Sequence, residues 1–241
     1  IIDSPERAFT EALALSDLDA LHLYDVIWAY CDPRVVDVLV LHPEFRAFEG
    51  KLVYTGYISR PRNDTTEFKN IRQTLGVHDN ERLIVASLGS GWMTEKMLSL
   101  IAGAVRQLAT IIAVRCVVLY GTYLDLNTRE LIAELEKEYR LFLPTPLVPD
   151  PAPYLMAASL FIGRGGYNTL TDVIRYGPPT IIIPATDHGA EQVLHARRLS
   201  EEGYCYVRDE ETLTEESLVR EILALWERPL GLKSDISLDG A

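Results

Sequence analysis

Residues 160–179 read LFIGRGGYNTLTDVIRYGPP, an order that predicts a short buried strand, a glycine turn, a helix and a stop. The apolar run 160–162 is typical of a strand, and the three glycines within 163–166 permit a tight turn in which another group approaches bare backbone. Apolar residues then recur at helical spacing across 167–176. Gly177, followed by two prolines, ends the helix.

A helix that begins at a glycine turn is a site for an anion. Its first N–H groups lack partners within the helix and the positive end of its dipole points outward, so a phosphate group is stabilised there. Arg164, inside the turn, would add a fixed positive charge. The alternative is that the glycines only permit close packing of the helix against the strand.

The surrounding chain predicts the layered sheet that would hold this turn. The expected strands are 82–88, 114–120, 141–143, 160–162, 180–183 and 204–207, and the expected helices are 94–110, 128–137, 153–158, 167–176, 191–202 and 214–226. Because the strands are continuously apolar and alternate with helices, they predict a parallel sheet covered on both faces. The expected fold class is therefore α/β, a Rossmann-like doubly wound parallel sheet over about residues 66–230.

The first 60 residues are less regular. A helix is expected over 1–22, a strand over 25–30 and a second strand-like run over 52–58, whereas the type of the apolar piece 35–41 stays open. The polar, turn-rich segment 60–66 reads as a linker, so we place a domain boundary there and expect domains at 1–60 and 61–241.

Composition narrows the class of protein. At 48% hydrophobic residues, the 241-residue chain can bury a full core, and a net charge of −12 argues against nucleic acid as a partner. Three widely spaced cysteines favour reduced thiols in a cytoplasmic protein over a disulfide framework or a zinc site. We see no membrane-spanning run and no signal peptide, and a first residue that is Ile rather than Met suggests a fragment.

Two further loops lie at the carboxyl ends of expected strands, where ligands of open parallel sheets collect. Gly89-Ser90-Gly91 follows the strand 82–88; it is no Walker loop, and it is either an ordinary strand-to-helix turn or a cradle for a phosphate or sugar. The loop 184–192 holds a second set of polar candidates, namely Asp187, His188, Glu191 and Gln192. These side chains would bind sugar or ribose hydroxyls, although helix capping by the two carboxylates and solvation of the imidazole are open alternatives.

Together these motifs carry a family resemblance. The segment 163–169, Gly177-Pro178-Pro179, Ile183-Pro184 and Glu191-Gln192 with Ala196 following resemble the donor-binding domain of GT-B glycosyltransferases, in particular the family 28 group that includes the peptidoglycan N-acetylglucosaminyltransferases. The resemblance covers about residues 52–225. It implies that this chain is a GT-B C-terminal domain, and that residues 1–60 are a remnant of the N-terminal acceptor domain with the interdomain linker.

The resemblance also implies roles for individual residues. Facing the diphosphate would be Gly89, Ser90 and Gly91 together with the helix-start amides of Gly165, Gly166, Tyr167 and Asn168, while Val148 would present backbone to the base and Glu191 and Gln192 would hold sugar or ribose hydroxyls. No catalytic residue is assigned, because the general base of this family comes from the acceptor domain.

The function expected from these features is transfer of a sugar from a nucleotide-diphosphate donor without a metal, since no Asp and His residues form a ligand cluster. No cofactor is expected beyond this nucleotide-sugar substrate. The acceptor is unknown, with lipid-linked molecules and glycans as candidates, and membrane contact would be peripheral, through the missing domain. The alternatives are a nucleotide-sugar 2-epimerase and a non-catalytic donor-binding subunit of a split transferase.

Overall fold

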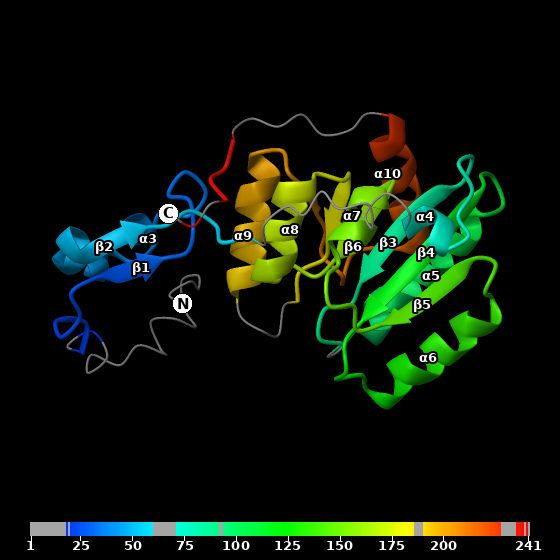
Figure 1. Cartoon of the computed structure of the whole chain (residues 1–241), viewed down its shortest axis with the longest axis horizontal. Helices are drawn as coiled ribbons and strands as arrows, with labels where there is room; N and C mark the ends of the chain where they lie inside the picture. Colours follow the sequence, from blue (N-terminus) through cyan, green and yellow to red (C-terminus); the bar gives the residue numbers. More distant parts are fainter. Residues whose placement is uncertain are drawn as a thin grey trace.

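A six-stranded parallel sheet forms the larger of two units in this chain (Figure 1). The structure, a computed structural model, describes residues 18, 20–59, 71–91, 94–185, 190–227, 235–238 and 240. The strands are β3 (Arg82–Ser87), β4 (Val114–Tyr120), β5 (Phe142–Pro146), β6 (Leu160–Gly163), β7 (Thr180–Ile182) and β8 (Tyr206–Val207), in the order β5-β4-β3-β6-β7-β8. The helices are α4 (Ile71–Thr74), α5 (Glu95–Leu108), α6 (Leu126–Lys137), α7 (Ala152–Ala157), α8 (Tyr167–Tyr176), α9 (Ala190–Glu201) and α10 (Glu215–Glu227).

Helices cover both faces of this sheet, so the expected doubly wound α/β fold is confirmed. Ile84 and Ala86 of β3 face one core, which they share with buried residues of α5, α6 and α10. Leu83 and Val85, which alternate with them in sequence, face the second core together with residues of α7, α8 and α9. Alternate residues of one strand thus feed two cores, which explains why the strand sequences are continuously apolar.

The direction of winding reverses in the middle of the sheet. From β3 the chain moves outward through β4 to β5, and from β6 it moves outward in the opposite direction through β7 to β8. The neighbours β3 and β6 therefore flank the topological switch point, where a crevice opens beyond the carboxyl ends of the strands.

The smaller unit is a two-stranded parallel sheet of β1 (Ile27–Ala29) and β2 (Leu52–Tyr54), with α3 (Val38–Leu41) and the 3-10 helix η1 (Pro43–Lys51) between the strands. One face is buried: Ile27, Ala29 and Phe45 belong to the same core cluster as residues of the larger unit. On the other face, Trp28 lies opposite Val53 in the strand register, and both side chains are largely exposed.

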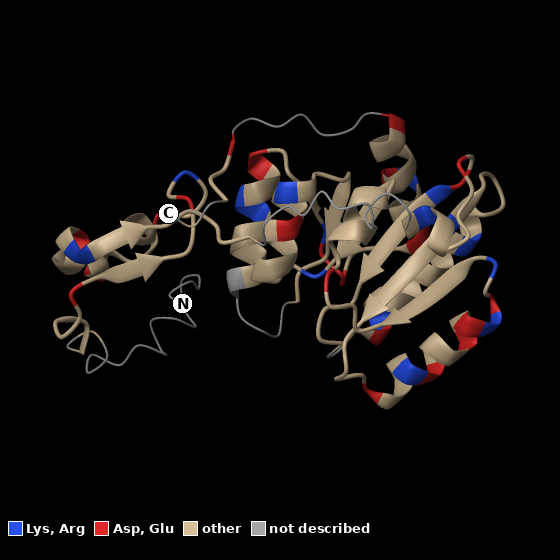
Figure 2. Cartoon of the chain, viewed as in Figure 1, with Lys and Arg blue, Asp and Glu red and all other residues tan. Residues whose placement is uncertain are grey.

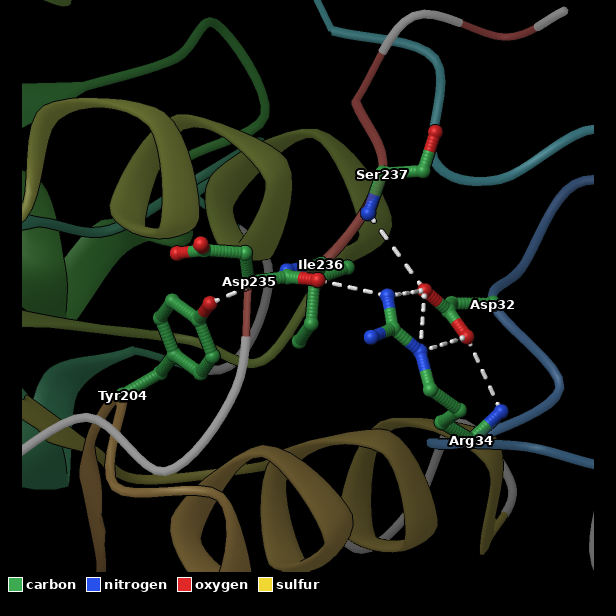
Figure 3. Close-up of polar contacts among 6 residues, drawn as sticks. All are labelled: Asp32, Arg34, Tyr204, Asp235, Ile236 and Ser237. Atoms are coloured by element: carbon green, nitrogen blue, oxygen red, sulfur yellow. Dashed lines mark hydrogen bonds and ion pairs between the residues drawn. The ribbon is translucent and has the colours of Figure 1, made fainter.

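The C-terminal segment 235–238 joins the two units (Figures 1 and 3). Asp32, in the loop after β1, accepts hydrogen bonds from Arg34 (2.6 Å to Nη2) and from the Ser237 amide (3.3 Å). Arg34 also donates to the carbonyl oxygen of Asp235, 2.5 Å away. On the other side of the segment, the Ile236 amide donates to the Tyr204 hydroxyl of the larger unit (3.2 Å).

Several expected boundaries differ from the structure. β5 continues through Pro144 to Pro146, which we expected to lie in a loop; the prolines are tolerated because β5 is an edge strand and pairs with β4 alone. The run 52–58 forms a strand only as far as Tyr54, and Gly56 then adopts a positive φ of 71°. The expected helix 1–22 and the linker 60–66 lie almost wholly outside the described residues, so the domain boundary stays a prediction.

Charged residues of both signs are interspersed on the outward helices, as Figure 2 shows for α6. Within the described ranges, no helix combines the length and the apolar character that crossing a bilayer requires.

Candidate functional site

A cavity of about 510 Å³ opens beyond the carboxyl ends of β3, β4 and β5 and against the start of α8. Its place is the crevice at the switch point between β3 and β6. It is lined by Ser87, Gly89, Ser90, Leu119, Tyr120, Gly121, Thr122, Tyr123, Leu147, Val148, Pro151, Gly166, Tyr167, Asn168, Thr169 and Asp172. All of these residues belong to the larger unit.

The first turn of α8 forms one wall of this cavity. Gly166 is the N-cap residue and has no side chain with which to cap the amides that follow. A Cβ placed on Gly166 would meet no atom within 4 Å, so this backbone borders open space. The first turn contains no acidic residue, and Tyr167, Asn168 and Thr169 all line the cavity. The N-terminal end of α8, with its positive partial charge, therefore opens into the cavity with no acidic residue in its own first turn.

The loop after β3 forms a second wall. Gly89 and Ser90 line the cavity, and Gly89 holds a left-handed backbone (φ 59°) with open space where a Cβ would be. Gly91 does not line it: a Cβ there would lie 2.7 Å from Cδ2 of Leu124, so Gly91 is placed by packing. The expectation that Gly91 faces the diphosphate stays a prediction; the structure shows only that Gly91 lies outside this cavity.

Arg164 also lies elsewhere than expected. Its guanidinium forms an ion pair with Glu210 (Nη2 to Oε1, 3.0 Å) and donates to the carbonyl oxygen of Ile183 (3.2 Å). Both charged side chains are largely buried, with 10% and 16% of their surface exposed, and neither lines the cavity. A buried cation needs a charged partner, and Glu210, on the loop after β8, supplies it. In the structure Arg164 thus forms an ion pair beside the cavity, and its role as a phosphate contact stays a prediction.

Gly165 and Gln192 serve the packing of α9 against the turn. A Cβ on Gly165 would approach the Gln192 carbonyl oxygen to 3.1 Å, so a glycine allows α9 to lie close. The Gln192 side chain accepts a hydrogen bond from the Ala185 amide (3.3 Å). Neither residue lines the cavity. Their expected contacts with the diphosphate and with the sugar hydroxyls stay predictions.

The structure does not test the other candidates of the loop 184–192. Asp187 and His188 lie outside the described residues, and Glu191 is placed in α9 by its backbone alone. Their roles toward sugar or ribose hydroxyls stay predictions. Val148, in the loop after β5, does line the cavity, although its backbone contact with a base is likewise untested.

Sequence reasoning missed ten of the sixteen described residues that line the cavity, and three of these are Asp172, Thr122 and Tyr123. Asp172 is 4% exposed and lies five residues after Tyr167, so its carboxylate sits one turn into α8. The sequence did hint at this position. Asp172 stands among the apolar residues of α8, and a carboxylate is costly to bury unless it has a polar partner. Thr122 and Tyr123 follow β4, and the sequence offers only Gly121 as a hint of their position.

Tyr120, which lines the cavity, has a shifted pKa. Burial raises the pKa of the Tyr120 phenol above its usual value, and the nearby carboxylate of Glu136 raises it further. The phenol is therefore neutral at physiological pH and is available as a hydrogen-bond donor. Among the described residues, no group of three or more His, Cys, Asp or Glu side chains is arranged to hold a metal ion.

Comparison with protein families gives one match over residues 93–237, more than half of the chain, to the model described as the glycosyltransferase family 28 C-terminal domain. Two curated relatives are bacterial UDP-N-acetylglucosamine--N-acetylmuramyl-(pentapeptide) pyrophosphoryl-undecaprenol N-acetylglucosamine transferases. The protein of Clostridium novyi is 33% identical over 78 residues, which are 31% of this chain and 22% of the relative. The protein of Clostridioides difficile is 30% identical over 190 residues, 73% of this chain and 43% of the relative.

Among solved structures, the S. aureus protein MnaA in complex with UDP superposes with a TM-score of 0.63 at 15% identity, over 91% of this chain and 56% of that one. At this identity the likeness concerns the fold. The aligned region covers less than half the length of the two curated relatives.

Proposed function

We propose that this chain, which belongs to the family of the glycosyltransferase family 28 C-terminal domain, supplies the nucleotide-diphosphate-sugar site of a glycosyltransferase. The expected GT-B architecture is shown by the family match together with the doubly wound sheet. The reaction and its acceptor belong to the proposal, because the chain matches only part of the relatives' length.

The observation that carries this proposal is the uncapped start of α8. Its amides and the positive end of its dipole border a cavity of about 510 Å³ at the sheet's switch point. When the bond between the sugar and the diphosphate breaks, negative charge develops on the diphosphate. Amides that are already oriented stabilise this charge without reorganising, which is the role of a preorganised anion hole.

The layout of the walls suits an elongated ligand. The diphosphate would lie between Gly166 and Gly89, and the nucleoside would extend over β4 toward Val148 after β5. From β6 to β5 there are three strand spacings of about 4.8 Å each. The buried carboxylate of Asp172, which also lines the cavity, is an acceptor that would suit a ribose hydroxyl group.

The acceptor would be a lipid-linked molecule, as it is by name for the curated relatives, whose acceptor carries pyrophosphoryl-undecaprenol. The protein would then work in the cytoplasm and meet the membrane surface peripherally, through an acceptor domain. The general base would come from the same source. Binding of the donor would need neither a metal nor another cofactor, since amides take the place of the cation.

Titration calorimetry with UDP-N-acetylglucosamine and UDP tests the proposal. We expect saturable one-to-one binding that persists in excess EDTA, and no sugar transfer by this chain alone. A folded chain that binds no UDP-, GDP- or TDP-sugar would contradict the donor site, and binding that depends on a divalent ion would contradict the metal-independent mechanism.

Two other functions, a nucleotide-sugar 2-epimerase and a donor-binding subunit of a split transferase, can be distinguished from the proposed one by experiment. A 2-epimerase needs an acid and a base in the cleft, whereas Asp172 is the one carboxylate among the described residues that line the cavity. Release of an epimerised sugar would nevertheless favour that class. A donor-binding subunit of a split transferase would transfer sugar only after a second polypeptide is added.

A further inference from the structure

Two apolar side chains stand exposed on the cavity wall that lies away from α8. Tyr123, after β4, is 69% exposed, and Leu147, after β5, is 67% exposed. Both line the cavity. Exposed apolar side chains that border a concave cavity of ligand size are candidates for contact with a ligand.

The backbone under both side chains is fixed. The Tyr123 amide donates to the carbonyl oxygen of Ser90 (3.0 Å), and the Leu147 amide donates to that of Tyr120 (2.9 Å). A Cβ on Gly121 would lie 2.6 Å from the Ser90 carbonyl oxygen, so only glycine lets the loops after β3 and β4 approach this closely. The Tyr123 ring is thus presented from an anchored loop, and little backbone freedom would be lost when a ligand covers it.

Strand order places this aromatic ring at the correct end of the cavity for a base. β4 and β5 lie on the far side of β3 from β6, and the uncapped start of α8 follows β6. A ligand whose diphosphate lies at α8 therefore brings its opposite end over the loops after β4 and β5. In a nucleoside diphosphate that end is a planar heterocycle, which an aromatic face accepts by stacking.

We propose that Tyr123 stacks on the base of the nucleotide and that Leu147 borders the same base site. This inference rests on the proposed function and adds a side-chain determinant of nucleotide binding at the end of the site away from the phosphates. Tyr123 acts on binding of the nucleoside alone and takes no part in holding the diphosphate.

The matched control is Tyr139, which is exposed to a similar extent (64%) but precedes β5 at the opposite end of the strands and does not line the cavity. Its side chain can be removed from an equally open surface. Replacing each tyrosine by alanine then separates a base contact from the general effect of losing an exposed ring.

Calorimetry with two probes, UDP and inorganic pyrophosphate, makes the test. We expect Tyr123→Ala to weaken binding of UDP about tenfold, the loss typical of one base–aromatic stack, and to leave the affinity for pyrophosphate unchanged. Tyr123→Phe, which keeps the ring, should bind UDP like the wild type, and Tyr139→Ala should change neither affinity.

The outcomes distinguish this inference from the function on which it rests. If the folded wild-type chain binds neither UDP nor pyrophosphate, the donor site itself is refuted. If the wild type binds UDP and Tyr123→Ala binds it equally well, or loses UDP and pyrophosphate to the same extent, the stacking role of Tyr123 is refuted while the donor site stands.

Discussion

The two units of this chain differ in how far helices cover their sheets. In the six-stranded unit helices cover both faces of the sheet, and every described residue that lines the cavity belongs to this unit. The two-stranded unit buries one face and leaves Trp28 and Val53 exposed on the other. Parallel sheets are normally covered on both faces, and among the described residues only the larger unit shows this pattern; it also supplies the whole described wall of the cavity. Binding should therefore respond to changes in the larger unit alone.

Substituting one glycine in each unit tests whether UDP binds in the larger unit alone, and it has the largest expected effect on affinity. Gly166 and Gly50 both have open space where a Cβ would project, and neither has a positive φ. Gly166→Leu should fold normally but fill the seat of the diphosphate, so we expect UDP affinity to fall about a thousandfold, or ~4 kcal/mol. Calorimetry measures the affinity, and thermal unfolding checks the fold.

Gly50→Leu is the control and should bind UDP like the wild type. Equal affinity of the wild type and Gly166→Leu would mean that the diphosphate does not lie at the start of α8. A similar loss in both variants would mean that the smaller unit contributes to the site.

The ion pair beside the turn should affect stability while leaving binding intact. Arg164→Met leaves Glu210 buried without its partner, which should lower the free energy of unfolding by about 3 kcal/mol. Because the guanidinium lies outside the cavity wall, we expect the dissociation constant for UDP to stay within about twofold of the wild-type value. Urea unfolding and calorimetry measure the two quantities. A large loss of affinity for UDP in a stably folded variant would indicate that Arg164 contacts the phosphates after all.

The same ion pair shows where sequence reasoning stopped. Continuous apolar runs and helical spacing predicted the strands of the larger unit and the start of α8, because both patterns are local. A Gly-Arg-Gly-Gly turn is compatible with an arginine that points to a phosphate or away from it. Glu210 decides the outcome, and it lies 46 residues further along the chain.

Other parts of the site and fold also depend on contacts between distant residues. Gly91 and Gly165 have the composition of a phosphate loop, yet packing against Leu124 and the Gln192 backbone explains their presence. The contact between Asp32 and Ser237 joins residues that are 205 positions apart, so no local pattern could reveal it. The course of β5 through its prolines likewise follows from its place at the sheet edge.

The link between the units offers a smaller effect. Asp32→Asn removes the charge that holds Arg34 and the Ser237 amide, and we expect a loss of about 1–2 kcal/mol in the free energy of unfolding at pH 7. Hydrogen exchange should rise in residues 235–238 of this variant while affinity for UDP is unchanged. Unaltered exchange in that segment would show that Asp32 does not hold it.

The pH dependence of this link gives the smallest effect. Burial by itself would raise the pKa of Asp32, but hydrogen bonds from Arg34 and Ser237 outweigh it and hold the pKa below its usual value. The carboxylate therefore stabilises the fold above about pH 4, and this contribution is lost as the pH falls through the lowered pKa. The difference in unfolding free energy between wild type and Asp32→Asn should shrink between pH 5 and about pH 3. A constant difference over that range, measured by urea unfolding, would contradict the assignment.

The contact between the start of α8 and a diphosphate is accessible to amide NMR of the whole chain. On titration with UDP, the account predicts that the amide resonances of Asn168 and Thr169 shift strongly downfield, that inorganic pyrophosphate shifts the same resonances, and that Gly50 stays unmoved. Saturation of the protein with UDP while the amides of Asn168 and Thr169 keep their free positions would contradict it.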